Sequence, residues 1–304
     1  MAALKKVAIL FPSFGNELTG KERVFIQNSG FNYEKYISET GKFLQRDLSF
    51  DDIFTNAPDE LDAQLFAYTL SNVMSGVLSS NDITASCVAG LSSGLYAALR
   101  YAGAFSFYDG LRIIDKAFWL IKEKSSSKKF LMGGIIGLNT KEVEQAIYSE
   151  NFNAEIINIT GEFTVVIAGE KDDVEKVLNL CKTEGALSVK HLPIYAPYHT
   201  KYAKDIKEEF EEFVNSIVMR DLTTPLISTV NTRALLQKND VKKEIVANLI
   251  KRIDWNLAMR RMINNGEKYF FECGGGRSLT KLAKFFEGDI KIYDAENIKL
   301  ILDA

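Results

Sequence analysis

Short, predominantly apolar runs alternate with longer amphipathic stretches in the first part of the chain. Val7–Phe11 and Ile83–Ala89 are short runs of the kind found in strands that are buried on both faces. Asp59–Leu78 carries apolar residues at helical spacing, and the pattern also predicts helices over Leu95–Tyr101 and Phe107–Ile121. Strands that repeatedly give way to helices indicate an α/β fold, with a mostly parallel sheet covered by helices.

The rhythm changes near Leu131. Six predicted elements follow in the order strand, helix, strand, strand, helix, strand, over Gly133–Leu138, Thr140–Ser149, Glu155–Ile159, Val165–Gly169, Asp172–Glu184 and Ser188–Pro193. Thr140 is the expected N-cap of the first of these helices. Because this order is that of a ferredoxin-like unit, we expect residues 131–194 to form an inserted ferredoxin-like subdomain. The large α/β domain would then comprise residues 1–130 and 195–304.

In the last part of the chain, apolar strands again alternate with amphipathic helices. Its predicted elements are the long helix Lys201–Val218, the strand Pro225–Val230, the helices Lys242–Arg252 and Trp255–Asn265, the strand Tyr269–Cys273 and the helix Ser278–Phe285. Together with the first strands, these elements complete an expected α/β-hydrolase-like core.

Composition and charge narrow the class of protein. The chain has 304 residues, of which 46% are hydrophobic and 25% charged, as in an ordinary globular enzyme. The formal net charge of −3 argues against nucleic-acid binding. No apolar run is long enough to span a membrane, and the one after Lys5 and Lys6 is too short for a signal peptide. The wide spacing of Cys87, Cys181 and Cys273 fits a reducing, cytoplasmic location and argues against a disulfide framework or a metal site.

A turn that can expose a nucleophile follows the second predicted strand. Residues 90–94 read Gly-Leu-Ser-Ser-Gly, which has the form Gly-x-Ser-x-Gly between a strand and a helix. The two glycines permit a sharp turn that lifts the Ser92 hydroxyl out of the sheet. The following helix then directs backbone N–H groups at a developing oxyanion. The alternative is a plain glycine-rich turn between a strand and a helix.

The base for this nucleophile can be sought among only two histidines. His191 lies inside a predicted strand, where a lone histidine is usually structural. His199 lies where the subdomain returns to the large domain, and pockets form at such junctions. We therefore expect His199 to take the Ser92 proton and to return it to a leaving thiol. More than a hundred residues follow His199, which argues against the α/β-hydrolase family, whose histidine comes late in the chain.

Five segments, in order along nearly the whole chain, carry a resemblance to a known family. Phe11–Glu17 is similar to F-P-G-Q-G-S-Q, Ala63–Phe66 to T-Q-P-A-L, Ala89–Leu99 to A-G-H-S-L-G-E-Y-A-A-L, Ala196–His199 to a catalytic-histidine segment and Glu272–Leu279 to E-I-G-P-G-K-V-L. Taken together, they resemble the malonyl-CoA:acyl-carrier-protein transacylase family, which includes polyketide-synthase acyltransferase domains. The resemblance is closest to its divergent standalone members, the trans-acting acyltransferases and acyl hydrolases of polyketide synthesis.

The resemblance implies roles for the residues that match the family's motifs. Ser92 becomes the acylated nucleophile and His199 its base. The backbone N–H groups of Phe14 and Ser93 would form the oxyanion hole. No bound cofactor is implied, because the acyl group is carried on the phosphopantetheine of an acyl carrier protein or of CoA.

Three further residues complete the implied site. Asn248 matches a position that orients the histidine through its backbone carbonyl, so that no triad carboxylate is required. Gln64 matches a polar residue of the substrate pocket, and Tyr198 precedes the histidine in that pocket. Ordinary capping or surface roles for Asn248 and Gln64 remain open.

The chain departs from the family where the acyl group binds. Malonyl users carry an arginine in a pattern like L-V-x-x-R-G, whose guanidinium binds the malonyl carboxylate bidentately. This chain has Ala117 at that position, and neither Lys116 nor Arg112 is an obvious replacement. Leu91 replaces a histidine before the nucleophile, and Phe14 replaces a glutamine of the oxyanion loop. An unpaired carboxylate in such a pocket would cost several kcal/mol, so we expect malonyl-CoA to be a poor substrate, although drift in a divergent member would also explain these changes.

Three functions remain open. The first is transfer of a non-malonyl acyl group between thioesters of acyl carrier protein or CoA, in polyketide or fatty-acid biosynthesis. The second is hydrolysis of acyl carrier protein thioesters through the same acyl-Ser92 intermediate. The third is a catalytically silent module that docks a carrier protein.

The expected partner in each case is an acyl carrier protein, and we expect the chain itself to be a monomer. Carrier proteins are usually acidic, so a local basic patch would be needed. One candidate patch is Lys122, Lys124, Lys128 and Lys129, and the other is Arg277, Lys281 and Lys284.

Overall fold

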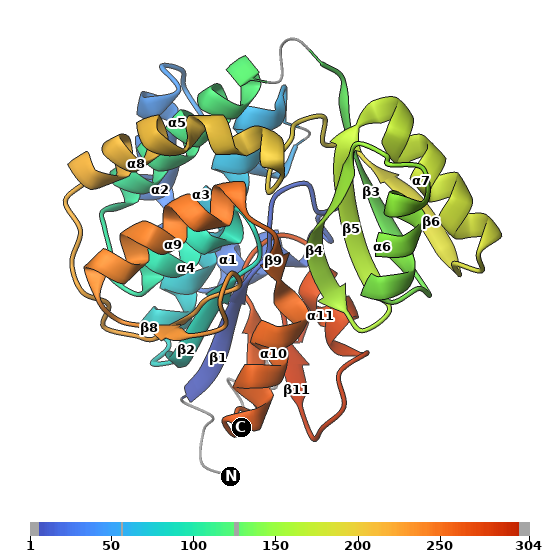
Figure 1. Cartoon of the computed structure of the whole chain (residues 1–304). Helices are drawn as coiled ribbons and strands as arrows, with labels where there is room; N and C mark the ends of the chain where they lie inside the picture. Colours follow the sequence, from blue (N-terminus) through green and yellow to red (C-terminus); the bar gives the residue numbers. More distant parts are fainter. Residues whose placement is uncertain (1–5, 56, 125–127, 298–304) are drawn as a thin grey trace.

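The computed structural model describes residues 6–55, 57–124 and 128–297. Its first sheet contains β1 (Lys6–Phe11), β2 (Thr84–Gly90), β7 (Leu226–Ile227), β8 (Ala234–Leu235), β10 (Tyr269–Glu272) and β11 (Lys291–Tyr293). The strands lie in the order β11-β10-β1-β2-β7-β8 (Figure 1). Neighbouring strands are parallel except β7 and β8, which are antiparallel. The predicted mostly parallel sheet is therefore present.

Helices cover both faces of this sheet. They are α1 (Lys21–Asn28), α2 (Glu34–Phe43), α3 (Glu60–Ser80), α4 (Gly94–Tyr101), α5 (Phe107–Lys124), α8 (Lys207–Ser216), α9 (Lys238–Ile250), α10 (Trp255–Asn264) and α11 (Ser278–Ala283), with the 3-10 helices η1 (Asp51–Phe54) and η3 (Lys201–Ile206). Alternate residues of β1 point to opposite faces of the sheet and pack against different helices. Ile9 packs in the core cluster that includes α3, α4 and α5, whereas Leu10 packs with α10 and α11. This burial on both faces explains why β1 is an unbroken apolar run.

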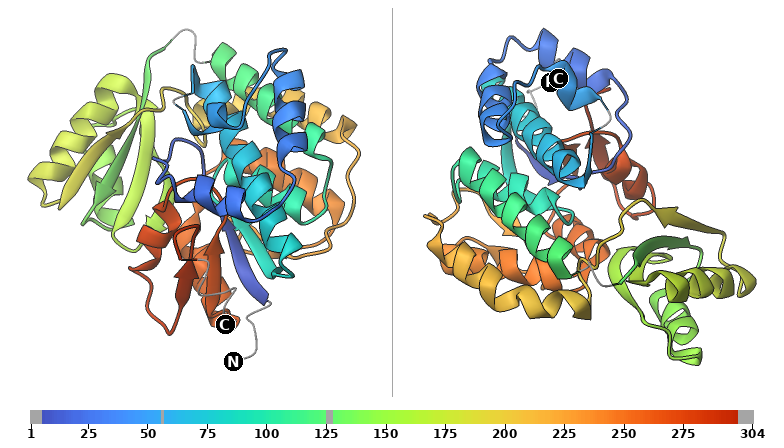
Figure 2. Two further views of the ribbon diagram at one scale, coloured as in Figure 1. Left: turned by 180° about the vertical axis from the view of Figure 1, so that it is seen from behind. Right: turned by 90° about the horizontal axis from the view of Figure 1, so that it is seen from above.

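A second sheet stands beside the first (Figures 1 and 2). It contains β3 (Phe130–Ile136), β4 (Ala154–Gly161), β5 (Thr164–Glu170), β6 (Ser188–Leu192) and β9 (Ile253–Asp254), in the order β6-β3-β5-β4-β9. The first four strands of that order are antiparallel to their neighbours, and β9 adds parallel to β4. Because β9 immediately precedes α10, this strand links the second sheet to the larger part of the molecule.

The two faces of the second sheet have different neighbours. One face packs on α6 (Thr140–Ser149) and α7 (Lys171–Thr183), which bury Val143 and Val177 against it. The other face contributes Met132, Ile157 and Ala168 to the core cluster of the larger part. The second sheet thus serves as a wall for the space between the two sheets.

Two predictions about helices were wrong in detail. The N-cap of α6 is Asn139, not Thr140. The Asn139 side chain accepts hydrogen bonds from the backbone of Lys141 and Glu142, and the Glu142 carboxylate accepts one from the backbone N–H of Asn139. The single helix predicted over Lys201–Val218 is divided into η3 and α8. At the start of η3, the backbone N–H of Ala203 donates to the carbonyl of Thr200, three residues earlier, which is the hydrogen-bond pattern of a 3-10 helix.

Other differences concern short or polar elements. The predicted strand Pro225–Val230 contains only two residues of regular strand, since the Ser228 hydroxyl accepts from the backbone of Val230 and Asn231 and starts a turn. Helices α1 and α2 were not predicted. Among the described residues, no helix is both long and apolar enough to cross a membrane.

Candidate active site

Ser92 lies on a tight turn between β2 and α4. Its φ angle is 52°, in the left-handed region that non-glycine residues rarely adopt. The glycines on either side are required by close approach. A Cβ on Gly90 would lie 2.3 Å from the backbone nitrogen of Leu95, and one on Gly94 would lie 2.2 Å from the carbonyl oxygen of Phe11. The turn therefore holds the Ser92 hydroxyl at the carboxyl end of β2 in a conformation that costs of order 1–2 kcal/mol.

His199 meets this serine from the segment between β6 and η3. Its Nε2 lies 2.8 Å from Ser92 Oγ, which is hydrogen-bonding distance. The histidine is buried and has a φ angle of 63°. Its backbone N–H donates to the carbonyl of Leu249, 2.9 Å away, near the end of α9. The pair is thus brought together from two sequence-distant segments, each with a strained backbone.

The surroundings of His199 favour its neutral form. Burial lowers the pKa of His199 to about 4, while the backbone carbonyls of Asn248 and Lys251 oppose that shift. These carbonyls lie near the ring, yet Nδ1 has no hydrogen bond of ordinary geometry within the described part of the chain. The Asn248 side chain turns away from the ring, to within 3.4 Å of the Thr229 hydroxyl. A neutral imidazole can accept a proton from the serine at neutral pH.

Two backbone N–H groups flank the serine. That of Phe14, after β1, donates to the Ser93 hydroxyl at 3.2 Å. Ser93 is the residue before α4, so its own N–H lies at the N-terminus of that helix. Both residues line the same cavity as Ser92. An oxyanion at this place would have to displace the Ser93 hydroxyl from Phe14.

A cavity of about 500 Å³ opens on the Ser92–His199 pair. Every residue expected at the site lines it: Phe14, Gln64, Leu91, Ser92, Ser93, Ala117, Tyr198, His199 and Asn248. The second sheet adds apolar side chains that the sequence did not single out, namely Met132, Ile157, Val166 and Leu192. It also adds Asn158, a buried residue of β4 whose Oδ1 has no hydrogen-bond partner within the described residues. The cavity therefore lies between the two sheets, and its wall is mostly apolar.

One polar corner interrupts this apolar wall. Tyr198 donates from its hydroxyl to Glu60 Oε1 at 2.8 Å. Gln64 donates from Nε2 to the Tyr198 hydroxyl at 3.0 Å and to Glu60 Oε1 at 3.2 Å. Burial raises the pKa of the Glu60 carboxyl, and the hydrogen bonds from Tyr198 and Gln64 partly offset this shift. Glu60 was not predicted, although its position four residues before Gln64 places both side chains on one face of α3.

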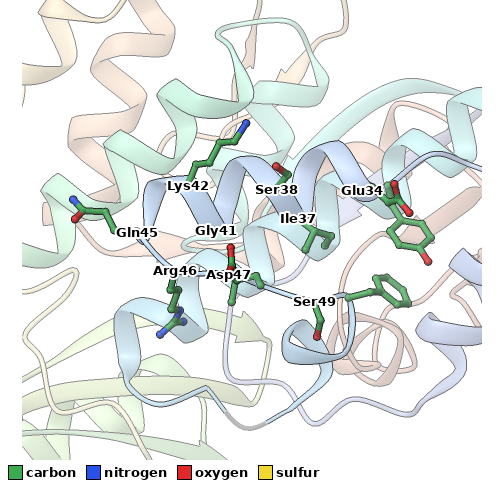
Figure 3. Close-up of a pocket in the computed structure, with 12 residues that line it drawn as sticks. Glu34, Ile37, Ser38, Gly41, Lys42, Gln45, Arg46, Asp47 and Ser49 are labelled. Carbon is green, nitrogen blue, oxygen red and sulfur yellow. The ribbon is translucent and has the colours of Figure 1, made fainter.

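Other candidate positions lie apart from this cavity. His191 is exposed on β6, opposite Gly133 of β3. A separate hollow of about 730 Å³ lies between α2 and the segment 45–50 (Figure 3). Its Arg46 is paired with Asp62 at 2.8 Å, and Ser92 and His199 are not among its lining residues. No group of three or more His, Cys, Asp or Glu side chains in the described ranges could hold a metal ion.

Comparison with known proteins gives a consistent result along the whole chain, although no family model matches it. The chain is 26% identical, over 99% of its length and 98% of the relative's, to the malonyl CoA-acyl carrier protein transacylase of Bacillus subtilis. It is 28% identical, over 91% of its length and 95% of the relative's, to the polyketide biosynthesis malonyl CoA-acyl carrier protein transacylase BaeC of Bacillus velezensis.

Solved structures agree in fold. The malonyl CoA-acyl carrier protein transacylase of Coxiella burnetii superimposes with a TM-score of 0.86 at 23% identity, over 100% of this chain and 98% of that one. A type II polyketide-synthase malonyl-transacylase, solved in complex with its acyl carrier protein, gives 0.84 at 22% identity, over 95% and 94% of the two chains. Along nearly its whole length, the chain is thus similar to malonyl-CoA:acyl-carrier-protein transacylases.

The described residues that line the cavity carry little charge. Ala117, where the family pattern carries an arginine, is buried on α5 and lines the cavity. Its neighbour Lys116 is paired with Glu209 at 2.5 Å, and Arg112 is paired with Asp109 at 3.2 Å. Among the lining residues that the structure describes, Lys281 is the only lysine or arginine, and its side chain is exposed. No buried cation takes the place of the missing arginine within this set.

Proposed function

We propose that the protein is an acyltransferase that forms an acyl ester on Ser92 and moves a non-malonyl acyl group between thioesters of acyl carrier protein or CoA. The observation that carries the proposal is the 2.8 Å approach of Ser92 Oγ and His199 Nε2 at the end of a mostly apolar cavity. A serine on a strained turn, paired with a neutral histidine, is the arrangement that activates a hydroxyl for acyl transfer.

The residues present can carry both halves of the reaction. As Ser92 Oγ attacks the thioester carbonyl, its proton passes to His199 Nε2. The N–H groups of Phe14 and Ser93 hold the oxyanion, and the carbonyls near the His199 ring stabilise the imidazolium. When the intermediate collapses, the C–S bond breaks, and the pantetheine thiolate leaves with the proton from His199. In the second half, an incoming thiol attacks the acyl ester by the reverse path.

The charge of the cavity supports an uncharged acyl group. A malonyl carboxylate in this space would face Ala117 where the family pattern carries a cation, and the carboxylate of Glu60 behind the polar corner. Desolvating an unpaired carboxylate costs several kcal/mol. Met132, Val166 and Leu192 offer favourable contacts to a short hydrocarbon chain instead.

The partner and pathway follow from the relatives. One relative is named for polyketide biosynthesis, and one structural neighbour was solved with its acyl carrier protein. We therefore propose an acyl carrier protein as donor or acceptor. Of the basic residues considered as a docking patch, Arg277 is paired with Asp294 at 2.6 Å. Lys281 is exposed on α11 and lines the cavity, while Lys284 is exposed at the C-cap of that helix. The side chain of Lys124 lies outside the described residues.

We also propose that the chain is divided into a catalytic domain and an inserted subdomain. Residues 1–130 and 195–304 would form a catalytic domain with an α/β-hydrolase-like core, and residues 131–194 an inserted ferredoxin-like subdomain. The chain order β3, α6, β4, β5, α7, β6 and the sheet order β6-β3-β5-β4 support this division. The subdomain would act as the second wall of the acyl pocket.

The test uses two distinguishable carrier proteins. The protein is incubated with one butyryl-loaded carrier and a second, unloaded carrier, and both are followed by mass spectrometry. Transfer predicts that the second carrier becomes butyrylated and that Ser92→Ala abolishes this product. Free butyrate without loading of the second carrier would show hydrolysis instead and would overturn the transfer proposal.

A further inference from the structure

The polar corner of the cavity has no hydrogen-bond donor left for a substrate carboxylate. Gln64 Nε2 carries two hydrogens, and the structure directs them at Glu60 and Tyr198. The single hydroxyl hydrogen of Tyr198 is directed at Glu60 as well. A carboxylate can only accept hydrogen bonds. The donors that it would need in this corner already donate to other side chains.

The group that occupies these donors is itself an acid. Glu60 begins α3 and reaches Tyr198 across 138 positions of the sequence, so its carboxylate closes a ring of three side chains. Tyr198 directly precedes His199 in the chain, and Tyr198 and Gln64 both line the acyl cavity. Burial raises the pKa of the Glu60 carboxyl, and the hydrogen bonds from Tyr198 and Gln64 and the charge of Lys122 oppose this shift.

We propose that Glu60 is a specificity-determining residue, which excludes acyl groups ending in a carboxylate by occupying the donors of Gln64 and Tyr198 and by placing a like charge behind them. This inference rests on the proposed function, because it concerns the acyl group delivered to Ser92. It adds a second barrier to malonyl beyond the alanine at position 117. Neutral acyl groups, including those with a hydroxyl that can donate to the corner, are not subject to either barrier.

The experiment measures selectivity at Ser92 in the full chain. The parent and Glu60→Gln are mixed with equal concentrations of butyryl- and malonyl-loaded carrier protein, and the early ratio of malonyl to butyryl ester on Ser92 is read by mass spectrometry. Glu60→Gln retains the side-chain shape, removes the charge and supplies new donors. We expect the malonyl-to-butyryl ratio to rise at least about tenfold.

Two further variants make the result decisive. Glu211→Gln makes the same chemical change on exposed α8, at a residue whose carboxylate lies 3.9 Å from Lys207, and should leave the ratio within about twofold of the parent. Tyr198→Phe frees one N–H of Gln64 and should raise the ratio about threefold. Thermal melting reports whether each variant folds, and Tyr198→Phe decides the matter if Glu60→Gln does not fold.

The outcomes separate the two proposals. Folded Glu60→Gln with an unchanged ratio, while the parent forms butyryl-Ser92, overturns the role of Glu60 and leaves the acyltransferase intact. Parent protein that forms no ester on Ser92 from either thioester overturns the proposed function, and the role of Glu60 with it.

Discussion

At the scale of single residues, the reactive pair consists of Ser92 and His199, and Glu60 completes the polar corner of the same cavity. Ser92 was indicated by its two flanking glycines, and His199 by its place at the return of the subdomain, and the structure places them 2.8 Å apart. Glu60 was missed, because helical spacing shows that it shares a face with Gln64 but cannot show that Tyr198 folds onto that face. Such contacts depend on side chains that are distant in the chain.

The burial of His199 makes a prediction about pH. The base must be neutral, and the pKa of His199 is lowered to about 4, so acylation of Ser92 should remain near its neutral rate as the pH falls toward about 4. With a histidine of ordinary pKa as the base, the acylation rate would fall to half near pH 6.5. The measurement is the initial rate of Ser92 acylation by a neutral thioester between pH 4 and 8, with folding followed by circular dichroism. A half-rate point near pH 6.5 in folded protein would contradict this account of the base.

The missing arginine can be restored. Ala117→Arg should raise the rate of malonyl labelling of Ser92 at least about tenfold, because it supplies a cation to the wall of the cavity. The rate of malonyl labelling should rise further in the double variant Ala117→Arg with Glu60→Gln, because the Glu60 carboxylate competes with malonyl for the new guanidinium. Lys116→Arg is the matched control: its side chain already pairs with Glu209, so malonyl labelling should stay within about twofold of the parent. Equal gains in both variants would show that the effect is not specific to the pocket.

At the scale of helices and strands, the sequence pattern predicted the long periodic segments well. It did not predict the short elements or the caps that local hydrogen bonds determine. The predicted strand Val7–Phe11 and helix Asp59–Leu78 correspond to β1 and α3 within one or two residues, because burial on both faces leaves a continuous apolar signal. Helix α1 was missed since its residues are mostly polar, and only Glu22, Phe25 and Ile26 of it are buried. The strand β9 has two residues, too few for any periodicity to appear.

The cap of α6 offers a direct comparison between the predicted and observed residue. Asn139→Ala should lower the free energy of unfolding by about 1 kcal/mol, because two backbone N–H groups lose their acceptor. Thr140→Ala should change it by only a few tenths of a kcal/mol. Urea titration of both variants is the check, and a larger loss at Thr140 would support the original sequence-based assignment.

The turn that carries Ser92 should not tolerate a methyl group. Gly94→Ala would place its Cβ 2.2 Å from the Phe11 carbonyl oxygen, so β1 or α4 must move, at a cost of about 2 kcal/mol or more. Gly134→Ala in β3 is the control, because nothing lies within 4 Å of its new Cβ. Its free energy of unfolding should stay within about 1 kcal/mol of the parent. If both variants lost the same free energy of unfolding, close packing at the turn would not be the reason for a glycine at position 94.

At the scale of the whole molecule, residues from both sheets and their flanking segments enclose the cavity. The first sheet positions Ser92 at the end of β2, and the second supplies an apolar wall through β3, β4, β5 and β6. The sequence pattern could not place the second sheet against the first, so Met132, Val166 and Leu192 were not recognised as pocket residues. Their apolar side chains support the proposed preference for an uncharged acyl group.

The most direct test of this account is a competition for Ser92. Equal concentrations of butyryl- and malonyl-loaded carrier protein are mixed with the parent protein, and the first ester formed on Ser92 is identified by mass spectrometry. The account predicts that butyryl-Ser92 exceeds malonyl-Ser92 by at least about tenfold, which corresponds to a difference of about 1.4 kcal/mol in activation free energy. Malonyl-Ser92 that forms as fast as butyryl-Ser92, or faster, would contradict it.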